Sequence, residues 1–465
     1  MKKINDNEFY TDILIIGGGS GGFGAAYSAG KTANDLGLDL SVTLVEKNNF
    51  IGGVSTYGGV NCWEPGVSGN GIHFEIAREL LEAKHAGIGG YEGVVCRERP
   101  YSLSVIHDEY KYEDTLFRLK IPDTYNLRRL HFEPDAMNEI MIKKLHKYNV
   151  KILFNTEFVD STLHNDNIES VFVKINNDIV NIKAKIFIDC TGNIILARKT
   201  GCQYMYGEDP KSAFDEFCAP EYPSNHLNGA TLLFRVEKCE ENFVETIPDF
   251  YKNFFPKIEE WYKNNVEQYR VYSQCNQYPN GDLNINMLPT IDGFEYLELK
   301  NDVMNILTAR VWYYFTWLQS EIGFGHKMKY IFKYPSARED YRLKGQYVLT
   351  ELDIRNGCHK KEEIIAYADH VLDIHGKSNI NVHGVPKYDN PYGIPYSCLL
   401  PVEIGNLLVA CRGASFSHIA ASSCRLSRTM IAIGEAAGTA AVLSVKHDKM
   451  LKNLNVEEVR ELLQI

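Results

Sequence analysis

The sequence lacks the patterns that mark several classes of protein. Its eleven cysteines include no C-x-x-C pair, so neither a disulfide framework nor a cysteine-bound iron–sulfur cluster of ordinary spacing is expected. Basic residues are outnumbered and the formal net charge is −11, which argues against a nucleic-acid partner. The opening segment MKKINDNEFYTD has no apolar stretch of the signal-peptide type. Together these absences predict a cytoplasmic protein with reduced thiols.

Long apolar runs are also missing. None approaches the ~20 residues that a membrane-spanning helix needs. The best candidate, VWYYFTWLQ at Val311–Gln319, is too short and fits a core helix, so no membrane partner is predicted. The chain has 465 residues, of which 45% are hydrophobic, so it can bury a large core and exceeds one ordinary domain.

Glycine, in contrast, is concentrated beside a strand-like segment. In DILIIGGGSGGFGAA, the residues Gly17, Gly19 and Gly22 form G-x-G-x-x-G between an expected buried strand and a helix that should end near Gly37. A second expected strand, SVTLVEKN, contains Glu46 near its end. This order predicts a dinucleotide site, because the three glycines allow a tight turn, close approach of the backbone to a pyrophosphate, and close helix–strand packing. A carboxylate at Glu46 suits ribose hydroxyls and disfavours NADP, which leaves NAD or FAD.

The next glycine-rich loop, FIGGVSTYGGVNCWEPG, resembles the corresponding loop of FAD-dependent oxidoreductases. These belong to the glutathione-reductase-type and fumarate-reductase-like flavoproteins, in which such a loop passes along the flavin. The resemblance implies FAD as the cofactor, with contacts from Gly52, Gly53 and Ser55. Relatives with covalent flavin carry histidine one residue before the serine, whereas Val54 stands here, so a non-covalent flavin is expected. Cys62 lacks the nearby second cysteine of dithiol flavoenzymes and is interpreted as a packing residue.

Two later segments carry the same resemblance. Residues 150–193 predict a β-meander, whose last strand and turn match the family at Thr191 and Gly192, with Asn193 in place of the usual aspartate. Near the C-terminus, NLLVACR predicts a strand and Cys424–Ser444 a helix rich in small residues. In the family this helix directs its N-terminus at the flavin ring, where it would stabilise negative charge. The predicted flavin-binding residues are Gly17, Gly19, Ser20, Gly22, Glu46, Lys47, Gly52, Gly53, Ser55, Thr191, Gly192 and Arg412.

These segments predict an α/β fold with a discontinuous domain. We expect a Rossmann-like FAD-binding domain at residues 1–200 and 386–465, and an inserted α+β substrate or cap domain at residues 201–385. The insertion contains strand-like GATLLFRVE, helix-like DFYKNFFPKIEEWYKNN and aromatic RVWYYFTWLQSEIG, whose aromatic residues we assign to the core. No second G-x-G-x-x-G supports a pyridine-nucleotide domain, so electrons are expected from the substrate or from an external carrier.

Three side chains are candidates for the chemistry. The resemblance places a histidine and an arginine of the family at His418 and Arg425, between the returning strand and the small-residue helix. We predict that His418 gives or takes a proton and that Arg338 and Arg425 hold substrate charge.

Two further patterns surround these candidates. Ser336 and Glu339 have the spacing of a capping box, which predicts a helix with Arg338 and Arg342 on one face. Relatives tend to have two adjacent arginines at positions 341 and 342, where this chain has tyrosine and arginine. His375 and His383 match no metal-binding spacing, so no metal is predicted.

The sequence therefore predicts an FAD-dependent oxidoreductase, a dehydrogenase or reductase, that exchanges a hydride with a small polar substrate, for which an anion is one option. An FAD-dependent monooxygenase and a flavin-binding electron-transfer subunit without its own substrate site remain open as alternatives. A homo-oligomer is compatible with the sequence. Substrate, reaction direction and electron partner are not encoded in any pattern found.

Overall fold

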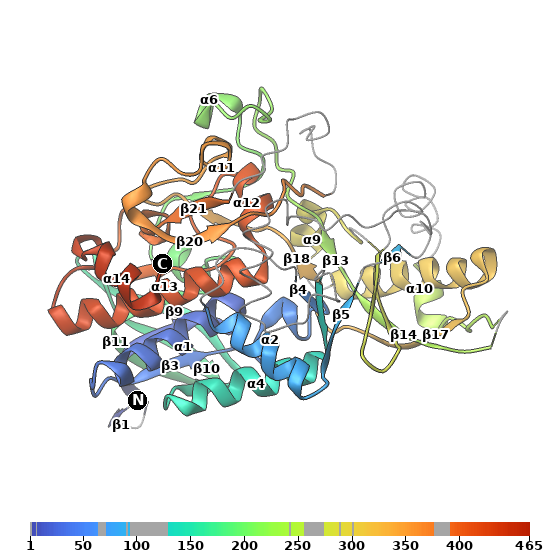
Figure 1. The fold of residues 1–465 in the computed structure, drawn as a ribbon, viewed down its shortest axis with the longest axis horizontal. Coiled ribbons are helices and arrows are strands. Elements are labelled where there is room, and N and C mark those ends of the chain that lie inside the picture. Colours follow the sequence, from blue (N-terminus) through green and yellow to red (C-terminus); the bar gives the residue numbers. More distant parts are fainter. Residues whose placement is uncertain are drawn as a thin grey trace.

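A computed structural model describes residues 2–5, 7–63, 71–89, 92–93, 129–240, 243–254, 274–287, 290–299, 302–375 and 391–465. The described chain has a mixed α/β fold, in which a large sheet with helices packed against it lies beside a smaller antiparallel sheet under a long helix (Figure 1). The predicted fold class is confirmed. His383, most of the expected helix after Lys252, and the predicted domain limit at residue 385 lie outside the described residues.

The large sheet has eight strands in the order β8-β3-β2-β11-β10-β9, with β1 added on β2 and β22 on β11. Its central pairs β2–β3, β3–β8, β2–β11 and β11–β22 are parallel, whereas β9, β10 and β11 form the predicted antiparallel meander. Strand β11 joins both parts because its first half pairs with β10 and its second half with β22. The strands are β1 (Lys2–Asn5), β2 (Glu8–Ile16), β3 (Val42–Val45), β8 (Lys151–Leu153), β9 (Thr156–His164), β10 (Asn167–Ile175), β11 (Asp178–Asp189) and β22 (Leu407–Val409).

Two helices from opposite ends of the chain, α1 (Ser20–Asp35) and α13 (Ser427–His447), pack together against this sheet (Figure 1). Their backbones are so close that a Cβ at Gly434 would stand 2.2 Å from the carbonyl oxygen of Gly21. The small-residue pattern is therefore a packing device. The helix expected over Cys424–Ser444 begins only at Ser427, because Cys424 ends a separate short helix, α12 (His418–Cys424).

Helix α13 is longer and more apolar than any run expected from the sequence. Among the described residues it is the one helix long and apolar enough to cross a membrane, although no such run was expected from the sequence. Its most apolar window is 89% buried inside the protein. Core helices pass the same test of length and composition, and this burial identifies α13 as one of them.

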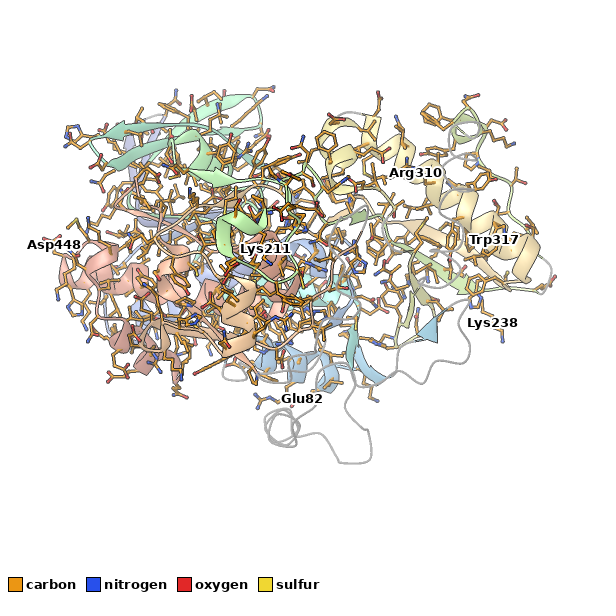
Figure 2. The ribbon with its side chains drawn as sticks, turned by 90° about the horizontal axis from the view of Figure 1, so that it is seen from above. Glu82, Lys211, Lys238, Arg310, Trp317 and Asp448 are labelled. Carbon is orange, nitrogen blue, oxygen red and sulfur yellow. The ribbon has the colours of Figure 1, made fainter. Side chains whose placement is uncertain are left out.

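The smaller sheet has its own hydrophobic core. Its five antiparallel strands are covered by α10 (Val303–Ile322), whose Leu307, Phe315 and Leu318 are fully buried against Phe234 and other strand residues. Trp312, Tyr313 and Trp317 pack at the margin of this core, as predicted for the aromatic segment. Figure 2 shows Arg310 and Trp317 on α10 at the end of the molecule opposite Asp448, which follows α13. The strands, in sheet order, are β17 (His326–Ile331), β14 (Phe234–Lys238), β16 (Leu283–Asn286), β15 (Gln274–Gln277) and β6 (Glu92–Gly93).

The remaining elements connect and cover the two sheets. Leu343, Leu349 and Ile365 pack into the core of the large sheet, so part of the predicted 201–385 insertion belongs to that core, and the domain limits themselves stay a prediction. The other helices are α2 (Ile72–Glu82), α4 (Pro134–Lys147), α5 (Ile195–Lys199), α6 (Lys211–Phe214), α7 (Asp249–Lys252), α9 (Gly293–Leu299), α11 (Glu351–Asn356) and α14 (Val456–Leu463). The small sheets are β4 (Cys62–Trp63) with β7 (Arg129–Phe132) and β5 (Ala86–Gly89), β12 (Tyr204–Met205) with β19 (Arg342–Leu343), β13 (Ala230–Thr231) with β18 (Ser336–Ala337), and β20 (Ile364–Ala368) with β21 (Tyr392–Pro395).

The helix expected to start at Ser336 is wrong. Ser336 begins strand β18, and its hydroxyl donates a hydrogen bond to the Gly58 carbonyl (2.7 Å) instead of capping a helix. The Glu339 carboxylate accepts from the backbone N–H of Asn228 (2.8 Å), which lies far away in sequence. A capping box does occur nearby, between Thr350 and Asp353 at the start of α11. Both side chains that the local pattern assigned to a helix cap therefore form hydrogen bonds with residues distant in sequence.

The contact between α13 and α2 contains a buried carboxyl group. Glu435 on α13 accepts a hydrogen bond from the N–H of Ile72 (3.1 Å) at the first turn of α2. Burial raises the pKa of Glu435 to about 8, and the nearby Glu75 adds to the rise, while the Ile72 hydrogen bond and Lys31 oppose it. Glu435 is therefore protonated in the folded protein at neutral pH, although it ionises readily once the chain unfolds.

This raised pKa predicts that stability falls with rising pH. Between its unfolded pKa, about 4.3, and about 8, the folded state holds a proton that the unfolded state has released. We expect Glu435→Gln, which keeps the acceptor for Ile72, to have a higher Tm than the parent at pH 8.5, and this difference to disappear as the pH falls below about 4.3. Thermal unfolding across this range is the measurement. A constant difference at all pH values would contradict the titration and leave only a packing effect.

Candidate active site

A cavity of about 890 Å³ opens where the carboxyl ends of β2, β3 and β11 meet. Ile16, Val45 and Cys190 line it at these strand ends, and Asn286 of β16 lines it from the smaller sheet. Ligands of open α/β sheets bind at this edge, and the volume falls in the range of ~300–1,000 Å³ that is typical of ligand sites. The cavity is therefore the candidate active site.

The glycine motif forms one wall of the cavity, and its three glycines differ in what surrounds them. Gly17 has a φ of +97°, and a Cβ there would stand 2.6 Å from the carbonyl oxygen of Cys190. At Gly22 a Cβ would stand 1.8 Å from the carbonyl oxygen of Gly17, so this glycine permits α1 to pack on β2. At Gly19, apart from its chain neighbours, no described residue has an atom within 4 Å of the Cβ position, because the backbone there faces the cavity. The turn at Gly17 and the close packing at Gly22 agree with the predicted roles, whereas the approach of a pyrophosphate to Gly19 stays a prediction.

The first turn of α1 presents donors to the same space. Gly19 precedes the helix and no side chain caps it, so the first backbone N–H groups are left for a ligand. The buried Ser20 hydroxyl has no hydrogen-bond partner among the described residues and lies on the cavity wall. An uncapped helix N-terminus with an orphaned buried hydroxyl fits the phosphates of a dinucleotide.

Glu46 and Lys47 follow β3 and also line the cavity. One oxygen of the buried Glu46 carboxylate accepts from the N–H of Gly18 (2.7 Å), and the other accepts from the backbone and side-chain nitrogens of Asn48 (2.9 and 2.7 Å). A carboxylate offers about four acceptor sites, so room remains for a ribose hydroxyl. These contacts hold the Glu46 carboxylate in place on the cavity wall.

The second glycine loop divides into residues on the cavity and residues behind it. Gly53 and Val54 line the cavity, whereas Gly52 and Ser55 do not. Gly52 has a φ of +89° and shapes the turn. Ser55 is buried, and its hydroxyl donates to Ser427 (2.9 Å) on α13. Ser55 thus joins the loop to the N-terminus of α13, a structural contact that the sequence could not indicate.

The turn after β11 supplies another wall. Thr191 and Gly192 line the cavity beside Arg412, and a Cβ on Gly192 would stand 3.0 Å from the Arg412 guanidinium. The buried Asp189 carboxylate organises this turn by accepting from the Thr191 N–H (3.0 Å) and hydroxyl (2.7 Å) and from the Ala197 N–H (3.0 Å). Asp189 was not among the predicted site residues.

Charged side chains gather near the start of α13. Arg425 donates to Asp373 (Nη2–Oδ2, 2.6 Å), and His375 bonds the other oxygen of the same carboxylate (Nε2–Oδ1, 2.7 Å). Arg338 lines the same cavity, where its Nη1 donates to the Gly229 carbonyl (2.9 Å) and the Thr231 hydroxyl (2.8 Å). Two arginines, one carboxylate and one histidine therefore face a common space.

The pKa values in this group reflect burial and mutual charge. Burial and, to a lesser degree, repulsion from Arg425 lower the pKa of Arg338 to about 9, while Asp373 opposes the shift. Burial would raise the pKa of Asp373, but His375, Arg425 and His370 bring it well below the ordinary value. Burial also lowers the pKa of His375, and Arg338 and Arg425 add to the effect against the attraction of Asp373. At neutral pH Arg338 is charged, Asp373 is ionised and His375 is neutral.

His418, predicted as the proton donor or acceptor, does not line this cavity. It is 1% exposed, and its Nδ1 contacts the Glu339 carboxylate at 2.9–3.0 Å. Glu339 in turn pairs with the fully buried Arg342, which also contacts Asp209 (2.9 Å). Burial lowers the pKa of His418 to about 4, and Arg342 adds to the shift. These contacts place His418 in a buried charge cluster behind the cavity wall, and its role in proton transfer stays a prediction.

A comparison with protein families identifies the family of this chain. The family model of FAD dependent oxidoreductases matches residues 12–463, nearly the whole chain. The chain belongs to the FAD-dependent oxidoreductase family. Its cofactor is accordingly FAD, as predicted. No curated protein matches the chain in sequence.

Solved structures similar to this FAD-dependent oxidoreductase have little sequence identity with it. A geranylgeranyl bacteriochlorophyll reductase-like protein of Thermoplasma acidophilum has 12% identity and a TM-score of 0.49, with 98% of this chain and 84% of that chain covered. A myxobacterial chondrochloren halogenase has 10% identity and a TM-score of 0.46, with 98% and 78% covered. The p-nitrophenol 4-monooxygenase of Pseudomonas putida has 10% identity and a TM-score of 0.42, with 98% and 81% covered.

The residues on the cavity fit FAD. Open space at Gly19, the orphaned Ser20 hydroxyl and the uncapped start of α1 suit a pyrophosphate, and the fixed carboxylate of Glu46 suits a ribose. Ser427 and Arg428, in the first turn of α13, line the cavity at the same end as the charged group. When bound, the flavin supplies a two-electron acceptor or donor for hydride.

Most of the predicted site residues meet at the cavity. Those that line it are Gly17, Gly19, Ser20, Glu46, Lys47, Gly53, Thr191, Gly192, Arg412, Arg338 and Arg425, whereas Gly22, Gly52, Ser55 and His418 lie behind its wall. Cys62, interpreted as a packing residue, also lines it. Asp373 and His375 were missed as a pair, although D-x-H spacing places two side chains on one side of an extended chain and could have indicated it. The individual roles stay predictions.

Proposed function

We propose that this FAD-dependent oxidoreductase exchanges a hydride between a non-covalently bound flavin and a small anionic organic substrate. The observation that carries the proposal is that Arg338 lines the cavity without an ion-pair partner among the described residues. Its hydrogen-bond acceptors among the described residues are the neutral oxygens of Gly229 and Thr231, and no described carboxylate lies within ion-pair distance. Arg338 is half-buried and has no ion-pair partner among the described residues, so an anionic ligand in the cavity would satisfy its charge.

Arg425 supports the same reading. One edge of its guanidinium is held by Asp373, while its Nε is buried and no described residue accepts from it. Arginine suits carboxylates because its planar donors match two oxygens at once. In the proposal Arg338 binds the substrate anion, Arg425 assists, and the cavity walls keep the reacting carbon at the flavin and exclude water.

An anaerobic absorption experiment tests this function. The purified holoprotein would be mixed in turn with pools of carboxylate metabolites and with pools of uncharged alcohols, sugars and amides. We expect the visible flavin band to bleach with a carboxylate pool and to stay unchanged with the uncharged pools. Bleaching by an uncharged pool alone would refute the anionic substrate.

The two alternatives give different results in the same setting. A monooxygenase would bleach with NAD(P)H and then consume oxygen with formation of a hydroxylated product. An electron-transfer subunit would bleach with no metabolite and would turn over only with a partner protein. Either outcome would replace the proposed dehydrogenase or reductase function.

A further inference from the structure

The histidine beside the two arginines is held in place by backbone contacts. The N–H of His375 donates to the Asn228 side-chain oxygen (2.9 Å), and the carbonyl of His375 accepts from the N–H of Gly229 (2.9 Å). The carbonyl of Gly229 accepts from Arg338 (2.9 Å). The dipeptide Asn228–Gly229 thus ties the backbone of His375 to the guanidinium that would bind the substrate, which fixes the distance between the two groups.

The carboxylate of Asp373 fixes the protonation pattern of the ring. An ionised carboxylate only accepts hydrogen bonds, so the Nε2 that contacts Asp373 must carry the hydrogen. Because the ring is neutral, Nδ1 then holds a lone pair. His375 lines the cavity, and Nδ1 has no hydrogen bond to any residue in the described parts of the chain. A carboxylate-oriented imidazole with its free nitrogen in a ligand cavity is the arrangement of a general base.

We propose that His375 transfers the proton that accompanies hydride exchange, that Asp373 positions it, and that the substrate is a hydroxy carboxylate. This inference rests on the proposed function. In the oxidative direction a bound FAD would supply the acceptor for the hydride of the substrate C–H bond, the electron pair of the O–H bond would form the carbonyl, and the proton would pass to His375 Nδ1. The reductive direction is the reverse, with the proton returning from Nδ1 to the carbonyl oxygen.

The charges around the ring favour a hydroxyl over an amine as the proton source. The charged or titratable groups that act on His375 and Asp373 are Arg338, Arg425 and His370. Two guanidinium groups against one carboxylate leave a net positive charge, which repels a substrate ammonium and attracts a carboxylate. An uncharged hydroxyl next to a carboxylate meets both conditions.

Acetate is the probe for the first test because it has the anion but no hydroxyl to oxidise. Its binding to the flavin-loaded protein at pH 6.5 would be measured by calorimetry in two buffers that differ in ionisation enthalpy. An anion placed beside His375 raises its pKa, so we expect uptake of a fraction of a proton with each acetate. His375→Gln should bind acetate without this uptake, whereas the control His447→Gln, at an exposed histidine paired with Glu458 (2.9 Å), should keep it.

Asp373 needs a readout that a purely structural role would not change. Asp373→Asn should reduce the acetate-linked proton uptake, because the amide no longer selects one tautomer, and Asp373→Glu should restore part of it. Glycolate and lactate would then be tested for bleaching of the flavin under anaerobic conditions. We expect His375→Gln to slow bleaching by about 10²–10⁴-fold, the usual contribution of general acid–base catalysis.

The outcomes separate the two proposals. If acetate does not bind to the wild-type protein, the anion site of the proposed function is wrong, and this inference falls with it. If acetate binds through Arg338 but proton uptake is absent, or is equal in His375→Gln, the proton-transfer role alone is refuted. If amino acids bleach the flavin and hydroxy acids do not, the substrate class is wrong.

Discussion

Replacing Arg338 by glutamine is expected to weaken acetate binding by about 10–100-fold, the equivalent of the ~1.5–3 kcal/mol that a hydrogen bond to a charged group contributes. Glutamine can still donate to Gly229 and Thr231, which the guanidinium contacts at 2.9 and 2.8 Å, so the wall of the cavity should keep its shape. The positive charge is what the substitution removes. The measurement is the Kd of acetate for the flavin-loaded protein.

The pH dependence gives an internal check on the same residue. Burial lowers the pKa of Arg338 to about 9, so its charge is present at neutral pH and is lost as the pH rises past that value. Wild-type acetate binding should therefore weaken above about pH 9, and binding to Arg338→Gln should lack this step. Arg460→Gln is the control, since Arg460 pairs with Glu457 (3.3 Å) on α14 away from the cavity. Unchanged affinity in Arg338→Gln would exclude this arginine as the anion site.

The second large effect should come from the glycine motif, where two alanine variants are expected to fail in different ways. Gly22→Ala places a Cβ 1.8 Å from the Gly17 carbonyl oxygen, so α1 must move off β2 and both stability and flavin binding should be lost. Gly19→Ala meets no atom within 4 Å and needs no unusual φ, since Gly19 has a φ of −66°. Its apoprotein should fold normally but bind FAD at least about tenfold more weakly, a change of ~1.4 kcal/mol.

Thermal unfolding of the apoprotein and titration with FAD distinguish these outcomes. Gly325→Ala serves as the control, because its Cβ would come no closer than 3.8 Å to a neighbour. If Gly19→Ala binds FAD as tightly as the parent, the backbone at Gly19 is not the surface that the dinucleotide approaches. If Gly22→Ala unfolds at the same temperature as the parent, the close contact of α1 with the glycine turn is wrong.

Local patterns in the sequence predicted the flavin-binding half of the molecule well. The alternation of strand, glycine turn, helix and acid around Gly17 to Glu46 is encoded in neighbouring residues, and β2, α1 and β3 form there. The meander up to Asp189 is likewise local, because each strand pairs with the next. The match of the family model confirmed the cofactor that these segments indicated.

The part of the cavity around Arg338 and His375 could not be predicted in the same way, since contacts between residues distant in sequence determine it. Ser336 and Glu339 have the spacing of a cap, but Gly58, Asn228 and His418, all distant in sequence, hold their side chains. His375 was considered only for a metal site, which its spacing did not support, because nothing nearby in sequence shows that Arg338 and Arg425 share its cavity. The sequence also placed His418 next to α13, but it could not show that the side chain is buried behind the cavity wall.

The joining of β22 to β11 and of α13 to α1 has a consequence for how the protein is made. The pairing of β22 with the second half of β11, and the cavity wall at Ser427, form only after about nine-tenths of the chain has left the ribosome, because both depend on residues beyond position 406. Until then, helix α1, which follows the glycine turn near the N-terminus, lacks its packing partner α13. Such late, long-range closure is slow and exposes apolar surface. We therefore expect the nascent chain to depend on chaperones, and FAD to be captured only near the end of synthesis.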